Sequence, residues 1–168
     1  MSEQFVSTDI GGTKHYFKDK EMSILHREDG PAIEHPDGDK FWYIDGLLHR
    51  EDGPAIEYSD GGTEWRFNGK LHREDGPAIE SPDGSKSWFV YGKRHRIGGP
   101  AVEFSNGRGY WYVNDELHRE DGPAVESLLE NSSFNVWWTH GRQLTEEQVN
   151  ERLLEIHKSK RIGVRTIR

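Results

Sequence analysis

The sequence predicts an all-β protein in which tandem 23-residue β-hairpin repeats form an elongated, twisted antiparallel sheet, with a C-terminal amphipathic helix as a cap. The main observation is one string that recurs at a constant interval: HREDGPA at 26–32, 49–55, 72–78 and 118–124, with the variant HRIGGPA at 95–101. This regularity indicates one structural unit stacked in fixed register. Composition agrees, because 32% hydrophobic residues cannot fill a conventional core for 168 residues, whereas 19 glycines and six tryptophans suit a thin, aromatic-rich fold.

Each repeat begins, after the Gly-Pro-Ala of this connector, with a strand that carries one fixed apolar position. The position is held by Ile33, Ile56, Ile79, Val102 and Val125. A tight turn is expected next, because Asp-Gly and Asn-Gly dipeptides supply the positive φ that hairpin turns require. These dipeptides are Asp37-Gly38, Asp60-Gly61, Asp83-Gly84 and Asn106-Gly107.

The second strand of each repeat contains a tryptophan, at positions 42, 65, 88 and 111. Alternation along a continuous strand places Trp42 with Ile44, and Trp65 with Phe67, on one face. We therefore expect a Trp/Ile ladder whose tryptophans are buried against their neighbours. The opposite face is expected to carry a glutamate ladder, at positions 34, 57, 80, 103 and 126. Two strands per repeat, about 4.8 Å apart, lengthen the sheet by roughly 10 Å per unit.

The repeats divide the chain into four segments. Residues 1–24 are an N-terminal capping segment or incomplete first repeat, because HYFKDKEMS lacks the tryptophan. The array covers 25–141, with Trp137 and Gly141 as one further tryptophan and turn glycine. A capping helix is expected within 142–158, and a basic tail covers 159–168.

The helix is predicted over residues 145–158 from its start signals and its apolar spacing. Thr145 and Gln148 have the spacing of a capping box, and the acidic residues 146 and 147 fall in the first turn, where the helix dipole favours them. Val149, Leu153 and Ile156 share one face, which is typical of an amphipathic helix that covers the end of a sheet.

Charge is distributed unevenly along the chain, whose formal net charge is −8. Residues 158–168 contain five basic residues and no acidic residue, whereas residues 1–157 have 17 basic and 30 acidic residues, a net charge of −13. An acidic body disfavours general nucleic-acid binding. The absence of cysteine excludes disulfides, thiolate metal sites and cysteine nucleophiles. Because we find neither a signal-peptide pattern nor an apolar run of about 18 residues, we expect a cytoplasmic protein without a membrane span.

The strings WYIDG, WRFNG, WFVYG and WYVND are each followed by the Leu-His-Arg-Glu-Asp-Gly-Pro-Ala connector or its variant. Over residues 25–141 this pattern resembles the divergent MORN-type repeats of bacterial and phage proteins. The resemblance implies a hairpin array that binds other molecules, since some members are antitoxin-like and better-known MORN proteins are protein- or lipid-binding scaffolds. It also implies the host cytoplasm as the location of a phage-encoded protein. The HREDGPA connector departs from the standard MORN spacing, so lipid binding is not carried over.

The His-Arg-Glu-Asp cluster of the connector could suggest a metal or catalytic site. However, it recurs at equivalent positions, whereas a catalytic site is usually one asymmetric constellation. We interpret it as structural: histidine caps backbone groups in the connector, arginine pairs with carboxylates such as the glutamate ladder of a neighbouring unit, and Gly-Pro redirects the chain. G-x-S-x-G, Walker and H-E-x-x-H motifs are absent from the sequence. The sequence therefore predicts no enzyme, no cofactor and no metal site.

The fourth connector departs from the repeat, with Arg94 in place of leucine and Ile97-Gly98 in place of Glu-Asp. The basic and aromatic residues around it form the candidate binding site, which comprises Lys93, Arg94, His95, Arg96, Arg108, Tyr110 and Tyr112. Arginine and tyrosine often dominate the binding energy of interfaces. The alternative is that this loop tolerates drift.

The sequence as a whole predicts a non-enzymatic interaction module. By resemblance, it is a phage or bacterial protein that binds and inhibits or sequesters a protein partner. Two alternatives remain open at this point. One is a small anionic ligand or nucleotide held in Arg/His pockets between units, and the other is nucleic acid contacted by the basic tail.

Overall fold

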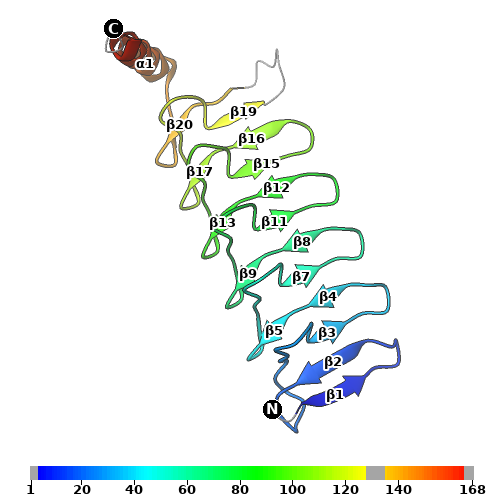
Figure 1. Ribbon diagram of the computed structural model, residues 1–168. Coiled ribbons are helices and arrows are strands. Elements are labelled where there is room, and N and C mark those ends of the chain that lie inside the picture. The colour runs from blue at the N-terminus through cyan, green and yellow to red at the C-terminus, as the bar shows by residue number, and fades with distance from the viewer. Residues whose placement is uncertain (1–3, 128–134, 165–168) are drawn as a thin grey trace.

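The computed structural model describes residues 4–127 and 135–164, and it shows the predicted array of β-hairpins with a helix at its C-terminal end (Figure 1). Eleven strands form one antiparallel sheet in which strands that follow one another along the chain are hydrogen-bonded neighbours. They are β1 (Phe5–Thr8), β2 (Lys14–Phe17), β3 (Ile33–Glu34), β4 (Lys40–Phe41), β7 (Ile56–Glu57), β8 (Thr63–Glu64), β11 (Ile79–Glu80), β12 (Lys86–Ser87), β15 (Val102–Glu103), β16 (Arg108–Tyr110) and β19 (Val125–Ser127).

The register of the first full repeat separates an apolar face from a charged face, although in the next repeat Glu64 lies on the apolar face, opposite Ile56 and Ile79. Ile33 lies opposite Phe41, which lies opposite Ile56, whereas Lys40 lies between Glu34 and Glu57. Cross-strand pairs of opposite charge stabilise a sheet, and the lysines therefore separate the like charges of neighbouring units. The predicted glutamate ladder is present, with lysine between glutamates at two of its four steps, but it lies on the same face as the repeat tryptophans and not on the opposite face as expected.

The hairpin loops of the sheet form at the predicted dipeptides. In the first full repeat the Gly38 amide donates to the His35 carbonyl at 3.0 Å, and the His35 amide donates to the Asp39 carbonyl at 2.9 Å. Gly38 has φ of 106°, so the loop is a type I turn followed by a left-handed glycine, a common three-residue hairpin connection. The Asp37 side chain fixes the loop by accepting from the Asp39 amide.

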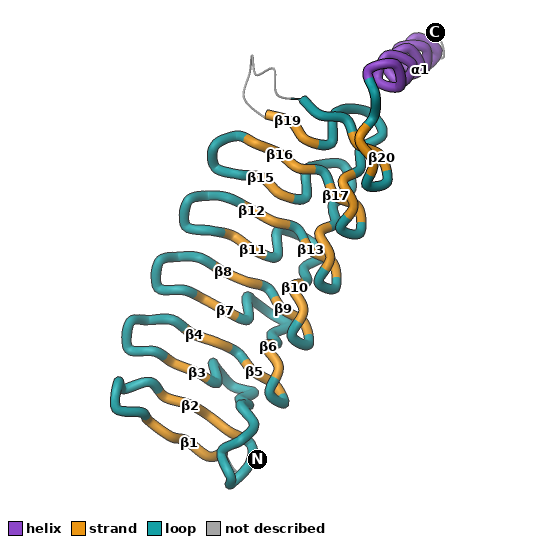
Figure 2. Tube along the Cα trace, turned by 180° about the vertical axis from the view of Figure 1, so that it is seen from behind, coloured by secondary structure: helices purple, strands orange, loops and turns teal. Residues whose placement is uncertain are grey.

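A second column of short hairpins lies along one side of the sheet (Figure 2). Each hairpin follows a tryptophan, and each forms its own two-stranded sheet. The pairs are β5 (Tyr43–Ile44) with β6 (Leu47–Leu48), β9 (Arg66–Phe67) with β10 (Lys70–Leu71), β13 (Phe89–Val90) with β14 (Lys93–Arg94), β17 (Tyr112–Val113) with β18 (Glu116–Leu117), and β20 (Trp138–Thr139) with β21 (Arg142–Gln143). The expectation of one continuous second strand through the tryptophan is therefore wrong.

The chain leaves the main sheet at the tryptophan because its two backbone groups bond in different directions. The Trp65 amide donates to the Ala78 carbonyl of the following repeat at 2.7 Å, whereas its carbonyl accepts from the His72 amide of its own side hairpin at 3.0 Å. The same two bonds recur at Trp42, Trp88 and Trp111. The tryptophan is thus the junction between the long sheet and each side hairpin.

The side hairpins close with two-residue loops in which both residues have positive φ, as in type I′ turns. The loops are Asp45-Gly46, Asn68-Gly69, Tyr91-Gly92, Asn114-Asp115 and His140-Gly141. Each is tied to the preceding unit, as where the Gly69 amide donates to the Leu48 carbonyl at 2.8 Å. Successive repeats are therefore joined along both columns.

The most buried side chains of the array are the connector alanines, and the expected burial of the tryptophans is wrong. The connector alanines at 32, 55, 78, 101 and 124 have no exposed surface, whereas the four repeat tryptophans are only half-buried. Because side chains alternate, Trp42 projects to the same side of the sheet as Ala55 and Glu57, and not with Ile56. A small residue under the connector lets the chain pass close to the sheet.

The first and last units adapt the same bonds to different residues. Tyr16 takes the tryptophan position of the N-terminal hairpin, since its amide donates to the Ala32 carbonyl and its carbonyl accepts from the His26 amide. At the other end, the Trp137 carbonyl accepts from the Leu144 amide at 2.9 Å. The SLLENSS stretch before it lies largely outside the described residues.

The C-terminal helix α1 (Glu146–Val164) continues past the predicted end at residue 158 into the expected basic tail. Its start is the predicted capping box: the Thr145 amide donates to Gln148 Oε1 at 3.0 Å, and the Gln148 amide donates to Thr145 Oγ1 at 3.3 Å. Arg152 Nε donates to the Glu120 carbonyl and ties the helix to the last connector. Nowhere in residues 4–127 and 135–164 is a helix long and apolar enough to cross a membrane.

Candidate functional site

The arginine of each connector lies flat over the aromatic ring at the junction that precedes it. Arg73 Cζ lies 4.1 Å from the centre of the Trp65 ring, and four further pairs repeat this stack at 3.7 to 4.2 Å. The four are Arg27 on Tyr16, Arg50 on Trp42, Arg96 on Trp88 and Arg119 on Trp111. A guanidinium over an aromatic face is attracted by the ring quadrupole, more strongly where water is excluded.

The same guanidinium groups bind three oxygens of their own connector and strand. Arg50 Nε donates to Asp52 at 2.9 Å, and its Nη1 donates to the Pro54 carbonyl at 3.2 Å and to Glu57 at 2.9 Å. This set recurs at Arg27, Arg73 and Arg119, and Arg96 keeps the carbonyl and the strand glutamate. The predicted pairing of the connector arginines with the glutamate ladder is confirmed.

The connector glycine is required by the arginine. A Cβ built on Gly53 would lie 2.6 Å from Arg50 Cζ, and the glycines at 30, 76, 99 and 122 show the same close approach to their own arginines. The guanidinium is thus held between an aromatic ring on one side and a glycine backbone on the other. Only a residue without a side chain leaves room for it.

The connector histidine caps the side-hairpin loop of the next unit. The Asn68 amide donates to His49 Nδ1 at 3.2 Å, and Nδ1 of the other connector histidines lies within hydrogen-bond distance of the corresponding loop. His49 Nδ1 also lies 2.8 Å from Asn68 Oδ1, so the backbone and the side chain of this loop residue both meet the same ring nitrogen. The predicted capping role is confirmed, although the capped groups belong to the next unit and not to the connector itself.

The connector aspartates gain an acid-sensitive contribution to stability from these arginines. The hydrogen bond and charge of Arg27, Arg50 and Arg73 lower the pKa of Asp29, Asp52 and Asp75 below their ordinary value of 3.8. A carboxyl whose pKa is lowered on folding stabilises the fold above its unfolded pKa, and this contribution is lost as pH falls through the folded value.

We therefore expect the melting temperature to be steady above about pH 5 and to fall below about pH 4. Asp52→Asn should melt at a lower temperature than the wild type at neutral pH, because the amide has no charge to attract Arg50. The two proteins should converge in acid, where Asp52 is itself protonated. Melting curves across this range measure the difference, and a difference that does not change with pH contradicts the assignment.

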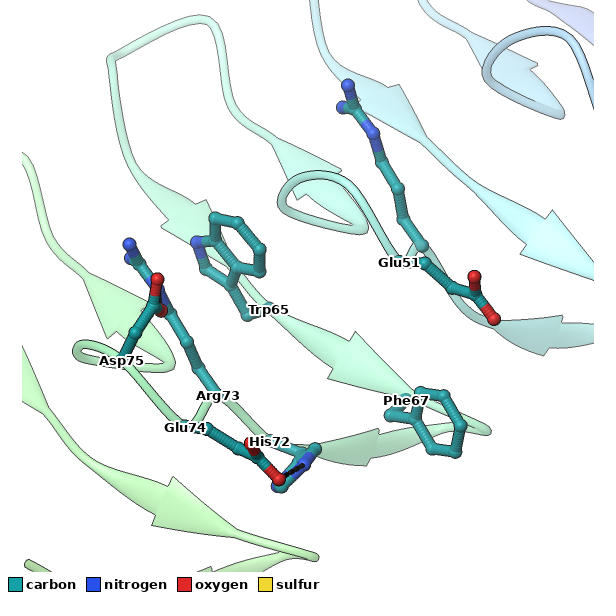
Figure 3. Close-up of a pocket in the computed structure, with 8 residues that line it drawn as sticks. Glu51, Trp65, Phe67, His72, Arg73, Glu74 and Asp75 are labelled. Carbon is teal, nitrogen blue, oxygen red and sulfur yellow. Dashed lines mark hydrogen bonds and ion pairs between the residues drawn. The ribbon is translucent and has the colours of Figure 1, made fainter.

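Grooves separate successive connectors, and aromatic side chains contribute to their lining. One groove, of about 400 Å³, is lined by Trp65 and Phe67 and flanked by the connectors that carry Glu51 and Glu74 (Figure 3). The equivalent groove one repeat earlier has about 700 Å³ and is lined by Trp42 and Ile44. The second contains two arginines against four carboxylates, so these grooves are acidic although arginine and histidine line them.

The residues predicted from the fourth connector fall into separate parts of the unit. Arg94 Cζ lies 3.9 Å from the centre of the Tyr112 ring, so these two come together between neighbouring side hairpins, Arg94 from β14 and Tyr112 from β17. Lys93 is exposed in the same strand, β14. Arg108 and Tyr110 lie in β16 of the main sheet, where Tyr110 packs edge-on against Phe104.

Two arginines of this unit are bound to carboxylates of the protein. Arg94 Nε donates to Asp115 Oδ1 at 2.7 Å, and Arg96 pairs with Glu103. His95 Nδ1 lies 3.1 Å from Asn114 Oδ1, so it contacts the side chain of the loop residue whose equivalents donate a backbone amide to the other connector histidines. Two departures from the repeat therefore compensate each other, because Asp115 replaces the loop glycine where Arg94 replaces leucine.

The fourth connector also differs in its backbone. Gly98 has φ of 80°, whereas the aspartates at the equivalent positions 29, 52, 75 and 121 are not in the left-handed region. Ile97, which stands in the place of the connector glutamate, is 77% exposed. The change removes two carboxylates from the connector and leaves an apolar side chain in the row of acidic ones.

Sequence reasoning missed one set of surface residues, the connector glutamates at 28, 51, 74 and 120. Their side chains are 74 to 85% exposed, and each lies 3.7 to 4.0 Å from Nε2 of the preceding histidine, beyond hydrogen-bond distance. The structure gives a packing reason for the histidine, arginine, aspartate, glycine and alanine of the motif, but not for this glutamate. The sequence feature that could have identified this glutamate as a surface residue of interest is its recurrence in four of the five connectors.

Within the described residues, no three histidine, aspartate or glutamate side chains are grouped so that they could hold a metal ion. The segment 165–168 of the expected basic tail lies outside the described residues. No protein-family model matches the sequence, and no curated protein is significantly similar to it.

Proposed function

We propose that this protein is a non-enzymatic interaction module that binds a protein partner along its connector face. The connector face is defined by the exposed glutamates 28, 51, 74 and 120 and the grooves between their connectors. The observation that carries the proposal is the occurrence of equivalent grooves, each lined by a half-buried tryptophan, at two consecutive repeats of an extended array. Repeat arrays of this kind offer long surfaces suited to macromolecular partners.

Two features support binding in place of catalysis. The polar side chains of the connector already serve the fold, since arginine holds tryptophan and histidine caps the next loop. In addition, equivalent grooves recur, which suits a partner that makes many similar contacts. Following the MORN-type resemblance, we propose that binding in the cytoplasm inhibits or sequesters the partner.

A protein partner is favoured over a small anionic ligand by the charge of the grooves. Each connector arginine is already paired with carboxylates, and in the larger groove carboxylates outnumber guanidinium groups. An anion there faces net repulsion. Aromatic side chains beside charged rims are also typical of protein interfaces.

Site-specific photo-crosslinking tests the proposal. Benzoylphenylalanine at position 51 places the probe at the groove, and the same residue at position 104 replaces an exposed phenylalanine away from it. In extract of the native host, we expect one discrete crosslinked protein from position 51, suppressed by excess unlabelled protein, and none from position 104. Equal crosslinking at both positions, or none at 51, contradicts a partner on the connector face.

A further inference from the structure

We propose that the connector face binds an extended polypeptide segment with a basic residue at every third position. This inference rests on the proposed function and names the chemistry of the partner. Three observations carry it: the spacing of the units, the acidic rims of the grooves, and the aromatic side chains that line them.

The spacing of the connectors matches an extended chain. Each repeat contributes two strands to the main sheet, so neighbouring connectors are separated by roughly 10 Å. Three residues of an extended polypeptide also span roughly 10 Å. A chain running along the array therefore presents every third side chain to an equivalent connector and to the groove beside it.

The chemistry of each groove matches the two parts of a lysine or arginine side chain. Trp65 and Phe67 offer apolar surface to the aliphatic stem, and Glu51 and Glu74 stand on the two flanking connectors, where each meets the cationic head of one basic residue (Figure 3). These glutamates are accessible to a cation, because their side chains are 81 and 85% exposed and their contacts with His49 and His72, at 3.8 and 4.0 Å, are ion pairs only when the histidine is protonated. The arginines of the groove do not oppose the cation, since each is paired with its own aspartate and strand glutamate.

The fourth connector then sets the register of the partner. The row along the array is Glu28, Glu51, Glu74, Ile97 and Glu120, which is three acids, one apolar residue and one acid. The complementary segment has five contact positions, each three residues after the one before. The first, second, third and fifth positions are basic, and the fourth is apolar. Ile97, highly exposed without an evident structural role, becomes a specificity residue in this arrangement.

Fluorescence anisotropy with a labelled synthetic peptide tests the inference. The peptide has five contact positions, one at every third residue, with leucine at the fourth and lysine at the others, and serine fills the remaining positions. A second peptide has the same sequence in reverse order, because the chain direction of the partner is not fixed by the array. A control peptide of the same composition has its lysines contiguous. We expect the periodic peptide to bind the full chain in one direction more tightly than the control peptide.

The matched variants are Glu51→Gln with Glu74→Gln, and Glu146→Gln with Glu147→Gln on the exposed first turn of α1. The groove pair should weaken the periodic peptide about tenfold, as expected for two partly exposed ion pairs, and the helix pair should leave it unchanged. Ile97→Glu should shift the preference at the fourth position from leucine to lysine.

Three outcomes overturn the inference. They are equal binding of both peptides, equal weakening by both pairs of variants, and displacement of the peptide by spermine at the same charge concentration. The first two indicate general attraction to an acidic protein, and the third indicates a site for small polycations. If crosslinking from position 51 succeeds while the peptide fails, the partner surface stands and only its basic register is wrong.

Discussion

Replacing Gly53 with alanine should lower the free energy of unfolding by about 1–3 kcal/mol, although the residue has no side chain and no unusual φ. The new Cβ would lie 2.6 Å from Arg50 Cζ. Because the arginine can swing away, the cost is not a permanent clash. It is the loss of the stack on Trp42 and of the hydrogen bonds to Asp52, Pro54 and Glu57. Urea denaturation followed by circular dichroism measures the effect.

The control for this prediction is the same change in an Arg50→Ala background. There the alanine has nothing to displace, and it restricts the unfolded chain, so Gly53→Ala should be neutral or stabilising by up to about 1 kcal/mol. The sign of the effect should therefore depend on residue 50. A similar loss in both backgrounds means that the glycine serves the backbone and not the arginine.

Replacing Trp65 with alanine should cost about 3 kcal/mol, near the low end for large aromatic-to-alanine substitutions because the ring is only half-buried. The substitution removes the surface on which Arg73 lies, and it opens the groove beside Phe67. The two backbone bonds of the junction survive, so the array should remain folded and weaken around this unit.

Trp65→Phe is the matched control, since phenylalanine keeps a ring under the guanidinium and should retain most of the stability. Chemical denaturation of both variants gives the comparison. A value for Trp65→Ala within about 1 kcal/mol of the wild type would show that the tryptophan serves binding alone and that the fold does not depend on the stack.

The elements that the sequence predicts correctly are those encoded by local rules. The fixed interval sets the stacked hairpins, the Asp-Gly dipeptides set the loops, and the Thr145 and Gln148 pair starts the helix. The pairing of arginine with the glutamate ladder was also accessible, because a repeated arginine and a repeated glutamate at constant separation can satisfy each other in every unit.

The side hairpins and the position of the core could not be predicted from alternation. Period-two patterning continues through FWYID whether or not the strand stays in the main sheet, so the break at Trp42 leaves no local mark. The tryptophan was expected in the core for its size, but the face it shares with Ala55 and Glu57 is crossed by the connector. The constant eight-residue separation of tryptophan and arginine was the available sign of their contact.

The candidate site was missed for a related reason. The sequence drew attention to the unit that differs, around Arg94, where the structure shows that arginine paired with Asp115. The exposed glutamates were overlooked because they are common to the repeats and were attributed to the fold. Exposure does not distinguish each of these glutamates from the equally exposed aspartate beside it, and only the short bonds of the aspartate to arginine separate the two.

The bonds between units have a consequence for the length of the molecule. Neighbouring units are joined by the same kinds of hydrogen bond along the array. The connector histidine caps the next loop, the tryptophan amide donates to the next alanine carbonyl, and the loop amide donates to the preceding side hairpin. An in-frame duplication of one period therefore inserts a complete unit whose every contact already exists elsewhere in the chain. Evolution can therefore lengthen or shorten such a protein by whole repeats. A divergent repeat such as the fourth then places a different side chain on the surface at a fixed distance from either end of the array.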